Sequence, residues 1–153
     1  MAEEKFSPTR NSELSTPNAP VLPDGYITQN FQFREFRCKH CGMNEIQKSF
    51  VVQLQKAREI AGIPFFINSG YRCPEYNQKF IDQGESIEKS AHTKGLAADI
   101  AAIASATRWK IIIALFGAGF SRIGIGTSFI HVDADTEKPQ EVAWTYPHNI
   151  RRS

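Results

Sequence analysis

The sequence predicts an α+β domain in which helices flank a small, mainly antiparallel sheet. Apolar residues recur at helical spacing in some segments, and in others they form short runs or alternate with polar residues. Read in order, these segments give helix, strand, helix, strand, helix and a final hairpin, an order typical of helices packed on a small sheet. With 153 residues, the chain can bury one core without disulfides.

The first helix is expected from about Gln47 to Ala61. Its apolar residues fall on one face, and they are Phe50, Val51, Leu54, Ala57, Ile60 and Ala61. Gly62 supplies a left-handed stop, and Pro64 just beyond it cannot continue the helix. These signals predict an amphipathic helix of about four turns.

Two further helices follow. Pro74 suits the first turn of a helix that continues to about Gln83 and stops at Gly84. Ser105 or Thr107 can cap the third helix. Two glycines end it, Gly117 and Gly119. Its core side is expected to consist of Trp109, Ile112, Ile113 and Phe116.

The strands are short and bounded by turn residues. Residues 30–36 alternate apolar and polar side chains, as a short edge strand or an extended segment does. Residues 64–68 and 96–101 read as buried strands. Residues 122–126 and 129–133 are expected to form a hairpin that turns at Gly126, Thr127 and Ser128.

Composition and charge exclude several classes of function. The chain carries 18 Lys and Arg against 16 Asp and Glu, a net charge of +2, and these residues are scattered, so nucleic acid is not an expected partner. No stretch approaches the roughly 20 apolar residues of a membrane span. Residues 1–25 are expected to be a flexible arm, residues 26–146 the folded domain, and residues 147–153 a basic tail. The first 20 residues hold no apolar run, so cytoplasmic synthesis without a signal peptide is expected.

Two histidines and an aspartate are candidate metal ligands. The segment from Ser90 reads S-A-H-T-K-G-L-A-A-D and contains His92 and Asp99. Small apolar residues precede Asp99, so its carboxylate is expected to be buried, which is costly unless it is paired or binds a metal. His131 lies in F-I-H-V-D, where a strand puts Asp133 on the same face. Two histidines and a carboxylate are a usual set for catalytic zinc, with water in the fourth position. The alternative is an N-capping aspartate and two ordinary histidines.

A second group contains the three cysteines of the chain. Cys38, His40 and Cys41 form a C-x-H-C motif, and a C-x-x-C pair can hold a structural zinc. Cys73 would complete a Cys₃His site if the fold brings it close. Three cysteines cannot all pair within the chain, which argues against a disulfide framework. Reduced buried thiols, or one disulfide with one free cysteine, are the alternatives.

Three motifs in order resemble the zinc D-Ala-D-Ala carboxypeptidase family. They are S-G-Y-R-C-P-E-Y-N from Ser69, the histidine–aspartate segment from Ser90, and F-I-H-V-D from Phe129. The segment N-F-Q-F-R-E-F-R-C from Asn30 is similar to the start of the small branch of the family. The family includes bacterial wall carboxypeptidases and phage endolysins that cut peptidoglycan peptides. Its fold is a small antiparallel sheet flanked by helices, so the resemblance implies the same fold class as the residue patterns do.

The resemblance also implies roles for individual residues. His92, Asp99 and His131 take the places of the zinc ligands. Arg72 takes the place of an arginine that contacts the substrate near the scissile bond, and a structural salt bridge is the alternative. Ser90 stands where the family often has a serine close to the substrate.

The catalytic base is less clear from the motifs. Several branches of the family place an Asp or Glu three residues before the second histidine, where this chain has Ser128, which cannot serve as a base near neutral pH. Asp133 is the expected base or the support of His131, since the small branch is similar in having H-x-D there; His148 is a weaker candidate. Tyr71, beside Arg72, is a candidate substrate contact that is expected to pack rather than to catalyse.

The implied activity is zinc-dependent hydrolysis of peptide bonds in peptidoglycan stem or cross-link peptides. The chain would act as a monomer, either as a phage or prophage lysis enzyme that reaches the wall through a pore or as a D,D-carboxypeptidase. One Zn²⁺ would be catalytic, and the cysteines can hold a second, structural one. Because Ser128 departs from the pattern, a non-catalytic, zinc-containing module that binds the cell wall or a phage particle is the alternative. Loop lengths do not decide between carboxypeptidase and endopeptidase.

Overall fold

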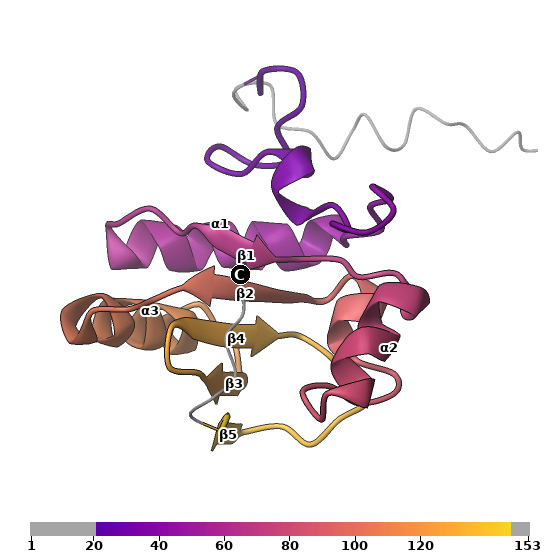
Figure 1. Cartoon of the computed structure of the whole chain (residues 1–153). Coiled ribbons are helices and arrows are strands. Elements are labelled where there is room, and N and C mark those ends of the chain that lie inside the picture. The colour runs from indigo at the N-terminus through magenta and orange to yellow at the C-terminus, as the bar shows by residue number, and fades with distance from the viewer. Residues whose placement is uncertain (1–20, 148–153) are drawn as a thin grey trace, which may run out of the picture.

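One sheet with strand order β1-β2-β4-β3-β5 forms the centre of the molecule. The computed structural model describes residues 21–147, so most of the predicted N-terminal arm and C-terminal tail lies outside the described residues. β3 pairs with β5 in parallel and the other neighbours are antiparallel, which confirms the predicted mainly antiparallel sheet (Figure 1). The strands are β1 (Ile67–Ser69), β2 (Ala97–Ala101), β3 (Arg122–Ile125), β4 (Phe129–Asp133) and β5 (Val142–Thr145).

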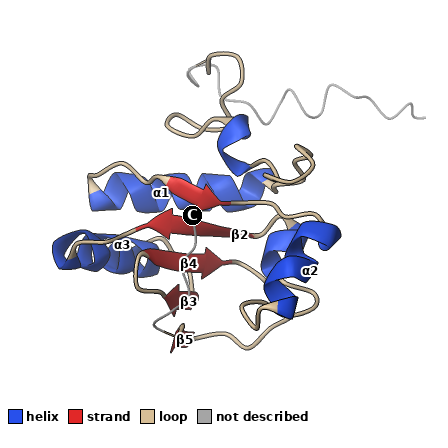
Figure 2. Ribbon diagram, viewed as in Figure 1, coloured by secondary structure: helices blue, strands red, loops and turns tan. Residues whose placement is uncertain are grey.

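All three predicted helices are present. They are α1 (Lys48–Ala61), α2 (Pro74–Asp82) and α3 (Ser105–Gly117), with short 3-10 turns at η2 (Phe33–Phe36) and η3 (Ala91–Lys94). Gly62 ends α1 in the left-handed conformation, as its position predicts. Helix α2 lies at the end of the sheet where β2 begins and β4 ends (Figure 2). Within residues 21–147, no helix combines the length and apolar character that a membrane crossing requires.

The hydrophobic core lies between one face of the sheet and the helices α1 and α3. Alternate strand residues supply the sheet side of this core, and Phe50, Leu54, Ile111 and Leu115 supply the helix side. The sheet contributes Ala98, Ile100, Ile123, Ile130 and Val132. Because successive strand residues point to opposite faces, the residues between them point away from the core.

The predicted core face of α3 is wrong. Trp109, Ile113 and Phe116 are 67%, 45% and 51% exposed, whereas Ile111 and Leu115 are fully buried. Ile112 is partly buried against the core, as predicted. Residues 109–116 are apolar nearly all round the helix, so spacing alone does not select the buried side. In α1 the same error is small, since only Ile60 of the predicted face is half exposed.

The N-terminal segment also differs from its prediction. Residues 33–36 form the turn η2 rather than a strand, because the Gln32 amide donates to Glu35 Oε2 at 2.6 Å and closes the turn. Phe31 and Phe36 are buried and pack edge to face at 5.6 Å. β1 begins later than the predicted 64–68, and its three residues make it shorter.

Gly95 offers a test of how tightly the segment that carries η3 is packed. It has φ +71°, and a Cβ there would lie 2.0 Å from the carbonyl oxygen of Glu45. Gly62 has φ +67° and no atom within 4 Å of such a Cβ, so Gly62→Ala is a matched control. The control should lose about 1 kcal/mol of unfolding free energy. Gly95→Ala should lose about 1–3 kcal/mol more, because backbone must shift. Equal losses in urea unfolding would contradict this packing.

Candidate metal centre and its pocket

One row of paired residues crosses the sheet on the face opposite the helical core. The pairing register places Ser69 of β1 beside Asp99 of β2, Asp99 beside His131 of β4, His131 beside Gly124 of β3, and Gly124 beside Trp144 of β5. Neighbouring side chains in such a row lie about 4.5–5.5 Å apart at Cβ. The sheet therefore brings together two of the three predicted metal ligands through backbone pairing alone.

The third ligand, His92, comes from η3 and completes a cluster. Asp99 Oδ1 lies 2.9 Å from His131 Nδ1 and 3.3 Å from His92 Nε2, and the two nitrogens lie 3.3 Å apart. A tetrahedral zinc ion with bonds of about 2.0–2.1 Å holds its ligand atoms about 3.3 Å from one another. All three side chains are buried. The donor set and its spacing therefore fit one divalent ion.

Each histidine is oriented by its other ring nitrogen. His92 Nδ1 donates to the backbone carbonyl of Gly70 at 2.7 Å, and His131 Nε2 donates to Asp133 Oδ2 at 2.8 Å. Both outer nitrogens therefore carry a proton, and Nε2 of His92 and Nδ1 of His131 face the cluster. This is the arrangement that the zinc chemistry of the predicted site requires.

Arg72 holds the outer oxygen of Asp99. Its guanidinium, only 1% exposed, donates to Asp99 Oδ2 at 3.3 Å, to Ser69 Oγ at 3.2 Å and to Asn77 Oδ1 at 3.3 Å. It also lies over the ring of Phe80, 4.4 Å from the centroid. The structural salt bridge considered for Arg72 is thus present, and the same side chain also lines the pocket described below.

Both carboxylate oxygens of Asp133 have partners. Oδ2 accepts from His131, while Oδ1 accepts from Arg122 Nε at 2.7 Å and from the Asp135 amide at 3.2 Å. Burial raises the pKa of Asp133, but the hydrogen bond to His131 and the neighbouring donors outweigh it and lower that pKa. Asp133 is therefore an ionised group that supports His131.

The charges of the cluster are strongly coupled. Burial, followed by the nearby Arg72, lowers the pKa of His92 to about 4. Burial would also lower the pKa of His131, but its bonds to Asp133 and Asp99 raise it. Burial would raise the pKa of Asp99, but the two histidines hold that pKa well below its usual value. A metal ion at His131 Nδ1 must displace a proton, so ion binding strengthens as pH rises.

A pocket of about 300 Å³ opens onto the cluster. Ser90 lines it, and its hydroxyl oxygen caps η3 by accepting from the His92 amide at 3.3 Å. Glu85 and Asp133 are the carboxylates among the described residues of the lining. Ser128 is not among them, and its carbonyl accepts from the Ala102 amide at 2.9 Å. The remaining polar and aromatic lining includes Ser86, Arg122, Lys138, Trp144 and Tyr146. His148 lies outside the described residues.

Strand β5 and its aromatic residues were not predicted from the sequence. The ring of Trp144 lies 5.6 Å from that of His131, centroid to centroid, and Tyr146 lies 6.4 Å from it. A Cβ on Gly124 would lie 2.7 Å from Tyr146 and 2.8 Å from Trp144, so only glycine lets both rings close over the site. The alternation in V-A-W-T-Y from Val142 is the signal that could have identified this strand.

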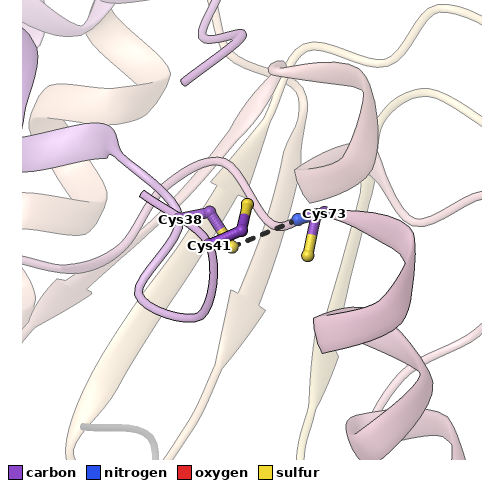
Figure 3. Close-up of side chains that lie close together, drawn as sticks. All are labelled: Cys38, Cys41 and Cys73. Atoms are coloured by element: carbon purple, nitrogen blue, oxygen red, sulfur yellow. Dashed lines mark hydrogen bonds between the residues drawn. The ribbon is translucent and has the colours of Figure 1, made fainter. Parts of the chain in front are cut away.

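The cysteine cluster forms beside the metal centre. The ligand atoms of Cys38, Cys41 and Cys73 lie within 4.8 Å of one another, and all three are unpaired thiols (Figure 3). Tyr71 is buried against Cys38 and Cys73. It is not among the described residues that line the pocket, so its place fits the expected packing role. Burial raises the pKa of Cys73 to about 11; for Cys38, backbone hydrogen bonds outweigh burial and lower the pKa.

Comparison with known proteins gives one family. The sequence model of the family described as Peptidase M15 matches residues 28–133, well over half of the chain. No curated protein sequence matches the chain. The matched range includes the three candidate ligands and the cysteine cluster, whereas β5 with its aromatic residues lies beyond it.

The contact between Asp133 and His131 should matter for metal affinity. Asp133→Asn replaces an ionised acceptor with a neutral one, so affinity for Co²⁺ at this centre should fall about 10–100-fold. The weak visible bands of nitrogen- and oxygen-ligated Co²⁺ report this binding separately from any thiolate ligation. Glu137→Gln, at a side chain 79% exposed, is the control and should bind as the wild type does. Unchanged affinity in Asp133→Asn would contradict this role.

Proposed function

Since the chain belongs to the Peptidase M15 family, the zinc D-Ala-D-Ala carboxypeptidases, we propose that this metallopeptidase hydrolyses peptide bonds in bacterial peptidoglycan. The observation that carries the proposal is the convergence of His92 Nε2, Asp99 Oδ1 and His131 Nδ1 beneath an open pocket. The family's wall-peptide substrates make stem or cross-link peptides the proposed substrate.

The residues of the cluster suit the zinc ion that the family uses. His92, Asp99 and His131 would hold it, and bound zinc polarises a substrate carbonyl and makes a water molecule more acidic. Asp99 brings one negative charge to the site, and Arg72 keeps its carboxylate turned toward the histidines. The Gly70 carbonyl and Asp133 each accept a hydrogen bond from the outer ring nitrogen of one histidine, so the inner nitrogens are the atoms that would face the ion.

We assign the acceptor of the water's proton to Glu85 rather than to Asp133. Both oxygens of Asp133 are engaged, by His131 on one side and by Arg122 and the Asp135 amide on the other. Glu85 is half-buried and is the second carboxylate of the described pocket lining. In this proposal Asp133 is a positioning residue, and Glu85 takes the proton and returns it to the leaving amine.

We also propose a place of action. The enzyme is made in the cytoplasm and serves as a phage or prophage lysis enzyme that meets the wall after a pore opens the membrane. Expression in a bacterial host tests this directly: lysis should need both the enzyme and a co-expressed pore-forming protein. Lysis with the pore-forming protein alone, or no lysis with both, would contradict the role.

Hydrolysis itself is tested on purified cell walls. The full chain should release amino acids or peptides that mass spectrometry identifies, and those products also tell carboxypeptidase from endopeptidase action. A chelator should abolish release and added Zn²⁺ should restore it. His92→Ala should be inactive, and Lys110→Ala, at an exposed position of α3, should behave as the wild type. Wall binding without any product would favour the alternative, a non-catalytic binding module of the same fold.

The assignment of Glu85 has its own test. Glu85→Gln should lower kcat by about 10²–10⁴-fold, the usual contribution of a positioned acid–base group, with zinc content unchanged. Asp133→Asn should lose activity mainly through metal loss, so excess Zn²⁺ should restore much of its kcat. If Glu85→Gln keeps its kcat and Asp133→Asn stays inactive in excess Zn²⁺, Asp133 is the base.

A further inference from the structure

The three cysteines come from two segments that meet beside the metal centre. Cys38 and Cys41 lie in the turn that follows η2, and Cys73 is the residue before α2 (Figure 3). Their sulfur atoms lie within 4.8 Å of one another. Zinc–sulfur bonds of about 2.3 Å in a tetrahedral site hold sulfur atoms about 3.8 Å apart. The three thiols are therefore close to the spacing that one ion requires.

The turn that carries the first two thiols is closed by its own backbone. The Gly42 amide donates to the Cys38 carbonyl at 2.8 Å, and the Cys38 amide donates to the Met43 carbonyl at 2.7 Å. Gly42 has φ +78°, a conformation that favours glycine. The closed turn brings Cys38 and Cys41 next to each other, with Cys73 close by (Figure 3).

Backbone amides point at two of the sulfur atoms. The Cys73 amide donates to Cys38 Sγ at 3.4 Å, and the Tyr76 amide donates to Cys73 Sγ at 3.4 Å. Such donors stabilise thiolates, which are the form of cysteine that binds metal. A nitrogen ligand is also at hand, since His40 Nδ1 lies 3.5 Å from Cys73 Sγ and its ring stacks on Tyr76 with an interplanar angle of 3°.

We propose that Cys38, Cys41, Cys73 and His40 bind a structural Zn²⁺ that is separate from the catalytic centre. Three thiolates and one imidazole form a closed tetrahedral set with no position for substrate. The ion joins the N-terminal segment to the loop 69–73, which holds the catalytic cluster in place.

The contacts of that loop show what such an ion would stabilise. The Tyr71 amide donates to the Phe36 carbonyl at 2.8 Å, and a Cβ on Gly70 would lie 2.7 Å from Phe36 Cα, so the two segments touch through backbone. The Gly70 carbonyl orients His92, and Arg72 orients Asp99. Loss of the structural ion should therefore loosen the partners of two catalytic ligands at once.

Metal content of the full chain tests the proposal without reference to activity. Wild type purified with Zn²⁺ should hold two ions per chain by elemental analysis. The double variant His92→Ala with His131→Ala should keep one ion, and its Co²⁺ form should show the intense near-ultraviolet band of thiolate-to-cobalt charge transfer. Cys38→Ser with Cys73→Ser should lose that band. Failure of the proposed catalytic function would leave the results on the double-histidine variant and the thiolate band unchanged.

A second measurement covers the case in which the cysteine variant does not fold. The folded double-histidine variant is titrated with an organomercurial reagent, and Zn²⁺ should be released in step with thiol modification. His40→Ala should bind the ion at least about tenfold more weakly, and His40→Cys should restore tight binding. Absence of zinc and of the thiolate band in the double-histidine variant, or a disulfide in the freshly purified wild type, would overturn the proposal.

Discussion

The burial of one negative charge organises the site. Asp99 has no solvent exposure, and an unpaired carboxylate in such a place costs several kcal/mol. Arg72 satisfies one of its oxygens, and His92 and His131 face the other. Each of these partners has further contacts of its own: Arg72 contacts Ser69 and Asn77, and the histidines contact Gly70 and Asp133. A single buried carboxylate thus requires an ordered set of neighbours drawn from β1, α2, η3 and β4.

One face of the sheet packs against the hydrophobic core, and the opposite face carries the candidate metal ligands. On one face, Ile100 and Ile130 pack against the helices and supply apolar burial. On the other, Asp99 and His131 occupy the positions next to them in sequence. Because the pairing of β2 with β4 sets both faces together, a slip of one residue would expose the core and disperse the ligands. The apolar packing that fixes the register of β2 and β4 therefore also fixes the relative positions of Asp99 and His131.

The strand positions of the candidate ligands Asp99 and His131 could be predicted because their signals are local. Small apolar residues before Asp99 indicate a buried strand, and alternation puts His131 and Asp133 on one face of a hairpin. The buried side of α3 could not be predicted, since Lys110 alone interrupts the apolar residues from Trp109 to Phe116 and does not mark a polar face. β5 was missed because its four residues are half-buried or exposed, so the alternation along Val142–Thr145 gives only a weak apolar signal. The occupancy of both Asp133 oxygens depends on Arg122 from another strand, which spacing does not reveal.

The absence of a side chain at Gly124 sets the position of the aromatic wall of the pocket. Trp144 and Tyr146 rest where a methyl group would otherwise stand, so the aromatic wall lies as near to His131 as the backbone allows. Any larger residue at that position would push both rings outward, and its side chain would stand beside His131 in the row of paired residues. A single position of β3 therefore sets how closely the aromatic wall of the pocket approaches the candidate ligand His131, and sequence change there would reshape the pocket without replacing any of the three candidate ligands.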